Sequence, residues 1–208
     1  MKIAGLKQTL RGVLEITPDA GSAFFLRILY LSQHEGCEDC VLEEDFFPGA
    51  EFEGEKLVNI MHASLVYSVE AAAMSYLARA EQSRFGLTQK LLKKGMDKND
   101  IALALDYLES EHLLDDRRFA GAWLRNRFIT HSEGRIKLTA ELSSRGVKKE
   151  AIKAALDDFF CEHTELELCS RAFSKLRRIC SNDEKNYASL QRLGFSYKTI
   201  QKAVMEKF

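Results

Sequence analysis

The sequence predicts a mainly α-helical protein in which tandem three-helix repeats form an elongated, curved array behind a small β-hairpin-containing N-terminal segment. One sequence pattern recurs three times, centred on Gly95, Gly146 and Gly194. Both prolines lie before residue 50, so nothing interrupts helix formation further along the chain. Apolar residues follow a 3.6-residue period from about residue 68 onward. Because stacked helical repeats expose a long surface, this pattern indicates binding rather than catalysis.

The first part of the chain differs from the rest. Apolar runs at residues 10–16 and 24–31 are joined by a turn sequence that contains Pro18 and Gly21, which predicts a hairpin. An acidic loop at 35–45 and a second turn at 47–49 follow, and a helix is expected to begin near residues 53–56. We predict an N-terminal β-containing arm or cap at 1–66, followed by three-helix repeats at 67–112, 113–163 and 164–208.

Each repeat is expected to contain a first helix, a short second helix that ends at the repeat glycine, and a third helix that begins two residues later. The first helices are predicted near 69–82, where Ser68 would be the N-cap, 116–130 and 164–180. The glycines can adopt the left-handed conformation at the helix C′ position without steric cost. The next residue of each repeat is apolar and is expected to fold back onto the helix that it follows: Met96, Val147 and Phe195.

Side chains around the third helices predict their caps and their buried faces. Asp97 and Ser196 are suitable N-caps for the third helices of repeats one and three, Asp115 is suitable for the first helix of repeat two, and Lys148 is not a capping residue. The expected core stripes lie at helical spacing: Ile101, Leu105 and Leu108; Ile152, Leu156 and Phe159; Ile200, Val204 and Phe208. In the first helix of repeat two, Phe119, Ala120, Trp123 and Leu124 are expected to face inward, with Arg118, Gly121 and Arg125 opposite.

Charge is unevenly distributed along a chain whose formal net charge is −1. Residues 1–66 hold 5 Lys/Arg against 11 Asp/Glu, and residues 67–208 hold 25 against 20. The positive excess of the repeats suits an acidic protein surface or a phosphate backbone.

Several motifs resemble the RecX family over roughly residues 68–208. The first is the segment from Arg84 to Gly95, with leucines at 87 and 91. The second is Leu113-Leu114-Asp115-Asp116 followed by Phe119-Ala120, Arg125 and Arg127. The third is Gly134-Arg135-Ile136 followed by Glu141-Leu142 and Arg145-Gly146-Val147. Gly86, where the family usually has a carboxylate, and Asn186, where it has Leu, depart from the pattern.

This resemblance implies a regulator that lies in the groove of the RecA–single-stranded DNA filament and inhibits strand exchange, ATP hydrolysis and co-protease activity, and thereby regulates DNA repair and the SOS response. From the resemblance and from charge, the candidate contacts to the partner or to DNA are Arg84, Lys90, Lys93, Lys94, Arg117, Arg118, Arg125, Arg127, Arg135, Lys137, Arg145, Arg171, Lys175, Arg177 and Arg178. We expect a cytoplasmic monomer with possible weak, non-specific DNA binding, and no membrane span, because no apolar run of 18 residues occurs.

Two other classes of protein compete with this interpretation. A helix-turn-helix DNA-binding protein is the alternative, because Gly146, Val147 and Ile152 have the spacing of that motif. The helix that would contact DNA carries Lys149 and Lys153 but also Asp157 and Asp158, which would face phosphates. An enzyme is not expected: the chain has no Gly-rich phosphate loop, no metal-spaced cluster and no catalytic triad, and neither cofactor nor metal is predicted. Cys37-Glu-Asp-Cys40 could be half of a zinc or redox site, but no second pair follows, so we interpret it as part of a solvated acidic loop.

Overall fold

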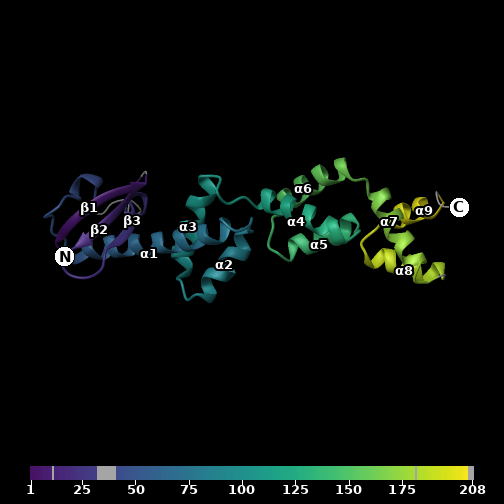
Figure 1. Cartoon of the computed structure of the whole chain (residues 1–208), viewed down its shortest axis with the longest axis horizontal. Coiled ribbons are helices and arrows are strands. Elements are labelled where there is room, and N and C mark those ends of the chain that lie inside the picture. The colour runs from purple at the N-terminus through teal and green to yellow at the C-terminus, as the bar shows by residue number, and fades with distance from the viewer. Residues whose placement is uncertain (11, 32–40, 181, 206–208) are drawn as a thin grey trace. The chain divides into compact units, whose positions relative to one another are not determined.

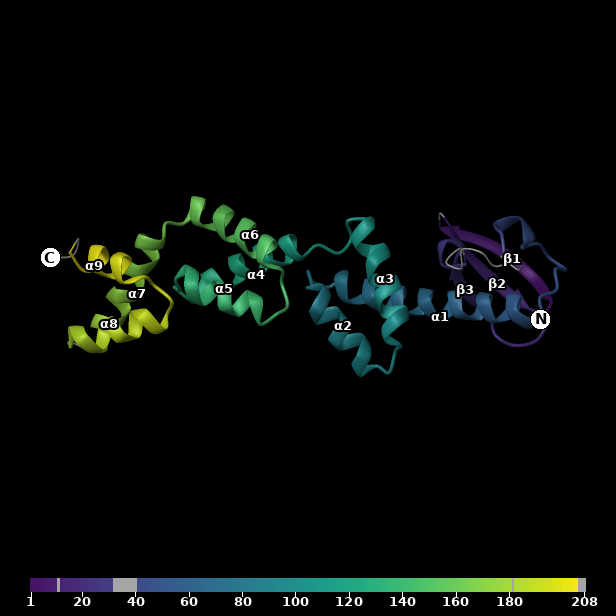
Figure 2. The same ribbon diagram turned by 180° about the vertical axis from the view of Figure 1, so that it is seen from behind.

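The computed structural model describes residues 1–10, 12–31, 41–180 and 182–205, and thus leaves Cys37, Cys40 and Phe208 outside the described residues. The chain forms two compact units, one of Met1–Arg79 with Thr88–Leu113 and one of Ala80–Leu87 with Leu114–Phe208. Figures 1 and 2 show a small sheet in the first unit and helices throughout the second. The prediction of a mainly helical chain with a small β-containing N-terminal segment is confirmed.

The first unit begins with a three-stranded antiparallel sheet in the order β1 (Ile3–Leu10), β2 (Val13–Pro18) and β3 (Phe24–Arg27). The predicted hairpin is β2–β3, in which Leu14 pairs with Leu26. Strand β1 was not predicted, because Gly5, Lys7 and Gln8 interrupt its apolar pattern. Two short 3₁₀ turns follow, at Ile28–Tyr30 and Glu43–Asp45.

Helix α1 (Gly54–Leu77) starts where the sequence predicts but runs through the expected start of the first repeat. The prediction that Ser68 caps a new helix is wrong: Ser68 lies inside α1, where its hydroxyl donates to the Leu65 carbonyl at 2.6 Å. Residues such as Ile60, Val66 and Ala73 are buried as α1 packs against β3 and α3 (Lys98–Ser110). Among the described residues, α1 is the one helix whose length and hydropathy would suffice to cross a membrane.

A buried ion pair joins the sheet to the helices of the first unit. Arg27 at the end of β3 donates two hydrogen bonds to Glu70 on α1, one of them at 2.7 Å. The Tyr30 hydroxyl donates to the same carboxylate at 2.7 Å, and the Arg27 guanidinium lies 4.1 Å from the ring centre of Tyr107 on α3. Both charged groups are therefore paired and hydrogen-bonded, as buried charges must be.

The second unit contains α4 (Asp116–Thr130), α5 (Arg135–Ser143), α6 (Lys149–Glu162), α7 (Glu165–Arg177), α8 (Asp183–Arg192) and α9 (Tyr197–Met205). Helix α2 (Arg84–Lys93) has its first turn in this unit. The first helices predicted at 116–130 and 164–180 correspond to α4 and α7. The predicted inward face of α4 is correct, since Ala120 and Leu124 are fully buried and Trp123 packs against the same core.

The repeat glycines end α2, α5 and α8 in the left-handed conformation, with φ of +78° at Gly95, +74° at Gly146 and +84° at Gly194. Each turn closes with the same two hydrogen bonds. At the middle turn, Gly146 N donates to Ser143 O at 2.9 Å, and Val147 N donates to Leu142 O at 3.3 Å. These bonds define the Schellman motif, which satisfies carbonyl groups that the helix end would otherwise leave unpaired.

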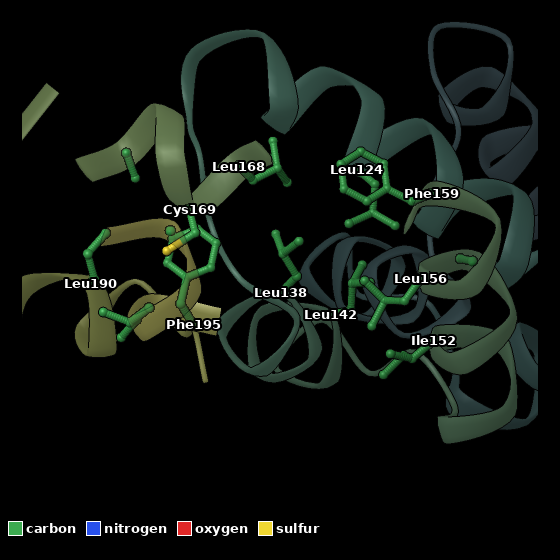
Figure 3. Close-up of a cluster of buried hydrophobic side chains, with 14 of the residues drawn as sticks. Leu124, Leu138, Leu142, Ile152, Leu156, Phe159, Leu168, Cys169, Leu190 and Phe195 are labelled. Atoms are coloured by element: carbon green, nitrogen blue, oxygen red, sulfur yellow. The ribbon is translucent and has the colours of Figure 1, made fainter. Parts of the chain in front are cut away.

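The third-helix stripes form the core as predicted, within the described residues. Figure 3 shows Ile152, Leu156 and Phe159 of α6 close to Leu142 of α5 and Leu124 of α4. The predicted caps are also confirmed. Side-chain oxygens of Asp97, Asp115 and Ser196 accept hydrogen bonds from first-turn backbone nitrogens, whereas Lys148 supplies no side-chain cap.

Candidate functional site

Arginines on the outer face of α4 surround a surface pocket of the second unit. Asp115 caps α4 by accepting from the backbone nitrogens of Arg117 at 2.7 Å and Arg118 at 3.2 Å, which fixes the start of the helix. One and two turns later the same face carries Gly121 and Arg125. The pocket has a volume of about 340 Å³ and is lined by Asp115, Arg117, Arg118, Gly121, Arg125, Ala155, Asp158, Phe159 and Glu162.

The three arginines of this pocket differ in their partners. Arg117 forms an ion pair with Asp158 at 2.7 Å, and Arg118 forms one with Glu81. Arg125 is exposed and makes no hydrogen bond or ion pair with any residue that the structure describes. Because Gly121 has no side chain, it leaves space beside the Arg125 guanidinium. Arg125 is therefore the charge on this face that is most available to a partner.

A second pocket, of about 260 Å³, lies between α5 and α6. It is lined by Arg135, Thr139, Ser143, Lys149, Ile152, Lys153 and Leu156. Of these side chains, only Arg135 was among the predicted contacts. Lys149 and Lys153 were considered only for the helix-turn-helix alternative and not as partner contacts, because the linear sequence does not show that one face of α6 borders a groove. The signal available in the sequence was that Lys149 and Lys153 are four residues apart and therefore lie on one face of the predicted helix.

Two predicted contacts instead belong to a buried ion-pair cluster. Arg127 donates to both carboxylate oxygens of Glu133 at 2.8 and 3.0 Å, and Lys137 pairs with Glu133 at 2.8 Å. Burial acts to raise the pKa of Glu133, but the hydrogen bonds and charges of Arg127 and Lys137 outweigh burial and hold this pKa below its usual range. The two cations thus stabilise the start of α5.

Several other predicted contacts lie over aromatic rings. The Arg145 guanidinium lies 4.8 Å from the Trp123 ring centre and also pairs with Glu141 at 2.8 Å. Arg135 pairs with Asp157 at 2.7 Å and lies over Phe160. The remaining cations of this kind, each with its ring, are Arg127 over Trp123, Arg171 over Phe128, Arg177 over Phe173, and Lys90 and Lys94 over Tyr76. Such contacts orient the charges and leave part of each exposed.

The last predicted contacts lie apart from these clusters. Lys93 on α2, and Lys175 and Arg178 around the end of α7, are exposed, and the Arg84 side chain is half-buried. Arg84 has a structural role through its backbone, since its nitrogen donates to the Asp116 carboxylate at 2.9 Å. The structure therefore brings Arg117, Arg118 and Arg125 together and distributes the others over separate surfaces.

The environments of His62, His163 and Cys169, which lie outside these pockets, indicate structural roles. Within the described part of the chain, no three His, Cys, Asp or Glu side chains gather closely enough to hold a metal ion. His62 contacts Asp100 at 2.8 Å, and the His163 ring stacks on Phe128 with 4.1 Å between ring centres. Burial, reinforced by the nearby charge of Glu165, raises the pKa of the Cys169 thiol to about 11, so little of the reactive thiolate exists at neutral pH.

The helices of the second unit and their turns define the class of this protein as one built from tandem three-helix repeats. Two family models match: "RecX, first three-helix domain" over residues 71–108 and "RecX, second three-helix domain" over residues 115–156. The chain is 37% identical over 145 residues to the regulatory protein RecX of Treponema pallidum (strain Nichols), with 70% of this chain and 88% of that protein covered. It is 37% identical over 137 residues to the RecX of Chlorobaculum tepidum, with 64% and 83% covered.

Solved structures show the same architecture. A crystal structure of regulatory protein RecX superposes with a TM-score of 0.74 at 22% identity, covering 97% of this chain and 98% of that one. RecX from Lactobacillus salivarius gives a TM-score of 0.62 at 23% identity, covering 69% and 97%. The chain belongs to the RecX family of regulatory proteins.

Proposed function

We propose that this protein regulates the RecA recombinase by binding in the groove of the RecA–single-stranded DNA filament, where it inhibits strand exchange, ATP hydrolysis and co-protease activity. Family membership supports the regulatory role. The observation that carries the binding proposal is the α4 arginine face, where Arg117, Arg118 and Arg125 surround one pocket. In this proposal the protein acts in the cytoplasm as a monomer and needs neither cofactor nor metal.

The charge balance of the α4 face explains why it suits a charged filament. Arg117 and Arg118 are already paired with carboxylates, so they hold the surface in shape, while Arg125 remains available to the partner. A guanidinium offers two parallel donors to a carboxylate or phosphate. An acidic group of the filament would gain a charge-assisted hydrogen bond there without first breaking an internal ion pair.

The test is the ATPase activity of RecA on single-stranded DNA with this protein added below the RecA concentration. Wild-type protein should inhibit, and Arg125→Glu should need at least about tenfold more protein for the same inhibition, because it converts an attraction into a repulsion. Lys98→Glu is the control, since Lys98 is also an exposed cation, at the first turn of α3. Absence of inhibition by wild-type protein at low salt, or equal effects of the two substitutions, would contradict the proposal.

The helix-turn-helix alternative is less well supported by the structure. Asp157 and Asp158 are exposed on α6, where they pair with Arg135 and Arg117, and would meet DNA phosphates if α6 entered a groove. The cations of α6, Lys149 and Lys153, line the pocket shared with α5. A nuclease footprint at a defined DNA sequence would favour this alternative, and weak, salt-sensitive binding without sequence preference would not.

A further inference from the structure

The groove between α5 and α6 is lined mainly by polar and cationic side chains. Arg135, Lys149 and Lys153 are its charged lining residues, and no carboxylate lines it. Ile152 and Leu156 also line it, but they are almost fully buried and belong to the core that Figure 3 shows. The α4 pocket is different, because its three arginines are matched by three carboxylates: Asp115, Asp158 and Glu162. Of these two pockets, the α5–α6 groove is the one with an uncompensated positive charge.

The two lysines of this groove are available for binding. Lys149 and Lys153 are both exposed and form no ion pair within the described ranges, whereas Arg135 is held by Asp157 at 2.7 Å. The hydroxyl of Thr139 donates to the Arg135 carbonyl at 2.8 Å, so its oxygen can still accept a hydrogen bond from a ligand. The groove therefore offers two ammonium groups without an ion-pair partner in the described ranges and one guanidinium held by Asp157.

Among the three repeats, the second alone has a cation at all three charged positions of the groove, and the first has two. When the repeats are aligned on their glycines, the positions of Arg135, Lys149 and Lys153 correspond in the first repeat to Arg84, Lys98 and Ala102. In the third repeat they correspond to Asp183, Tyr197 and Gln201. There the Gln201 amide donates to the Tyr197 hydroxyl at 3.0 Å, so these two positions satisfy each other. Repeats that share a fold thus differ at the positions that line the groove.

We propose that the α5–α6 groove is a docking site for an extended acidic segment of a partner protein, in which carboxylates occupy alternate positions. Two such carboxylates would pair with Lys149 and Lys153, and the side chain between them would point away from the groove. Arg135, Thr139 and Ser143 lie at steps of four along α5, so the groove follows that helix for about 12 Å. An extended chain of about four residues spans this length.

Two features favour a peptide over single-stranded nucleic acid. Alternate side chains of an extended peptide lie about 7 Å apart, close to the spacing of about 6 Å between residues one helical turn apart, such as Lys149 and Lys153. Single-stranded nucleic acids are bound on aromatic rings that stack with the bases. The lining residues of this groove include no aromatic side chain.

The probe is a short fluorescein-labelled peptide of alternating glutamate and leucine, titrated with the full-length protein at low salt and followed by fluorescence anisotropy. Lys149→Glu with Lys153→Glu should weaken binding at least about tenfold, because both contacts become repulsive. The matched control is Lys198→Glu with Lys202→Glu. These lysines have the same spacing on α9 and are also exposed, but each lies one residue away from the position equivalent to the groove lysine. The control should weaken binding less than about threefold.

Further measurements separate the rival explanations. A peptide with glutamine in place of glutamate should bind much more weakly, and an oligothymidylate should not displace the acidic peptide. Equal losses in the two double variants, or equal binding of the glutamine peptide, would overturn the proposal. Displacement by oligothymidylate that depends on Lys149 and Lys153 would identify a nucleic-acid groove instead and would overturn it as well.

Folding and target are controlled separately. Circular dichroism should give the same helix content for both double variants. If Lys149→Glu with Lys153→Glu unfolds, the double variant Lys149→Ala with Lys153→Ala is used in its place. The inference does not depend on RecA, because the assay contains none. If the wild-type protein inhibits the RecA ATPase but does not bind the peptide, the groove proposal alone is wrong. If it binds the peptide but does not inhibit the ATPase, the proposed function alone is wrong.

Discussion

The backbone nitrogen of Gly134, at the start of α5, donates a 2.8 Å hydrogen bond to the carbonyl oxygen of Leu193, at the end of α8. Ile136 N donates to Gly194 O at 3.3 Å beside it. Backbone N–H groups at the start of α5 thus pair with backbone carbonyl groups at the end of α8, and each helix alone would leave these groups unpaired. The arrangement is also favourable for both helix dipoles. A similar connection joins the start of α2 to the end of α5. There the Ser83 hydroxyl accepts from Gly86 N and donates to Arg145 O at 2.9 Å.

Because the end of α8 contacts the start of α5, the same substitution should lower the free energy of unfolding by different amounts at two repeat glycines. A Cβ at Gly194 would overlap the backbone nitrogen of Lys137, whereas a Cβ at Gly95 would meet no atom within 4 Å. Both residues have positive φ, so alanine should cost about 1 kcal/mol at either one. Gly194→Ala should cost about 2 kcal/mol more, because backbone must shift to admit the methyl group. Urea denaturation followed by circular dichroism measures both, and equal destabilisation would show that the contact between α8 and α5 relaxes freely.

The second prediction concerns Glu133, whose carboxylate is buried with Arg127 and Lys137. Glu133→Gln should destabilise the protein at pH 7 by about 3 kcal/mol, because it leaves two cations near a buried neutral side chain. The matched control is Glu141→Gln, which removes the more exposed ion pair with Arg145 and should cost less than about 1 kcal/mol. Trp123, the single tryptophan, reports unfolding of this unit by fluorescence.

The same substitution predicts a pH dependence. Because the pKa of Glu133 is lower in the folded protein than its ordinary value of 4.5, its stabilisation is complete above about pH 4.5 and is lost as pH falls through the folded pKa. The stability difference between wild type and Glu133→Gln should therefore narrow from pH 5 toward pH 3. A difference that stays constant over this range would show that the charge of Glu133 is not what stabilises α5.

Much of the fold follows from local sequence signals, because caps, turns and helical stripes depend on neighbouring residues. Asp97, Asp115 and the three repeat glycines have their predicted roles for this reason. The second role of Gly194, close approach to Lys137, depends on a contact between residues far apart in the sequence. Asn186, where the family has Leu, is buried, and its amide donates at 2.9 Å to the carbonyl of Cys180, six residues earlier.

The candidate site was less predictable than the fold, because a count of Lys and Arg does not show which charges are already paired. Arg127 and Lys137 were candidate contacts because of the resemblance and their charge, and both form ion pairs with Glu133. Lys149 and Lys153 were not among the candidates, although both are exposed on a groove. Which charged side chains form ion pairs depends on how the helices pack.

The third prediction concerns the buried pair of Arg27 and Glu70. Glu70→Gln should destabilise the first unit by about 3 kcal/mol, because the guanidinium then remains buried without a counter-charge. Tyr30→Phe, which removes one hydrogen bond to the same carboxylate, should cost about 1 kcal/mol. Circular dichroism measures this loss of stability during urea denaturation. In Glu70→Gln, the fluorescence of Trp123 should change at a higher urea concentration than the dichroism signal, because Trp123 lies in the other unit. Coincident shifts of both signals would contradict independent unfolding of the first unit.

The last prediction concerns His112, which ends α3 and is the one non-glycine residue with positive φ, +56°, in the described ranges. Its nitrogen donates to Glu109 O at 3.0 Å and Leu113 N donates to Leu108 O at 2.9 Å, so His112 occupies the position that glycine holds in the three repeat turns. His112→Gly and His112→Ala both remove the imidazole, but only Ala retains a Cβ. The glycine variant should therefore be about 1 kcal/mol more stable than the alanine variant. Equal midpoints in urea would mean that the turn accommodates a Cβ without strain.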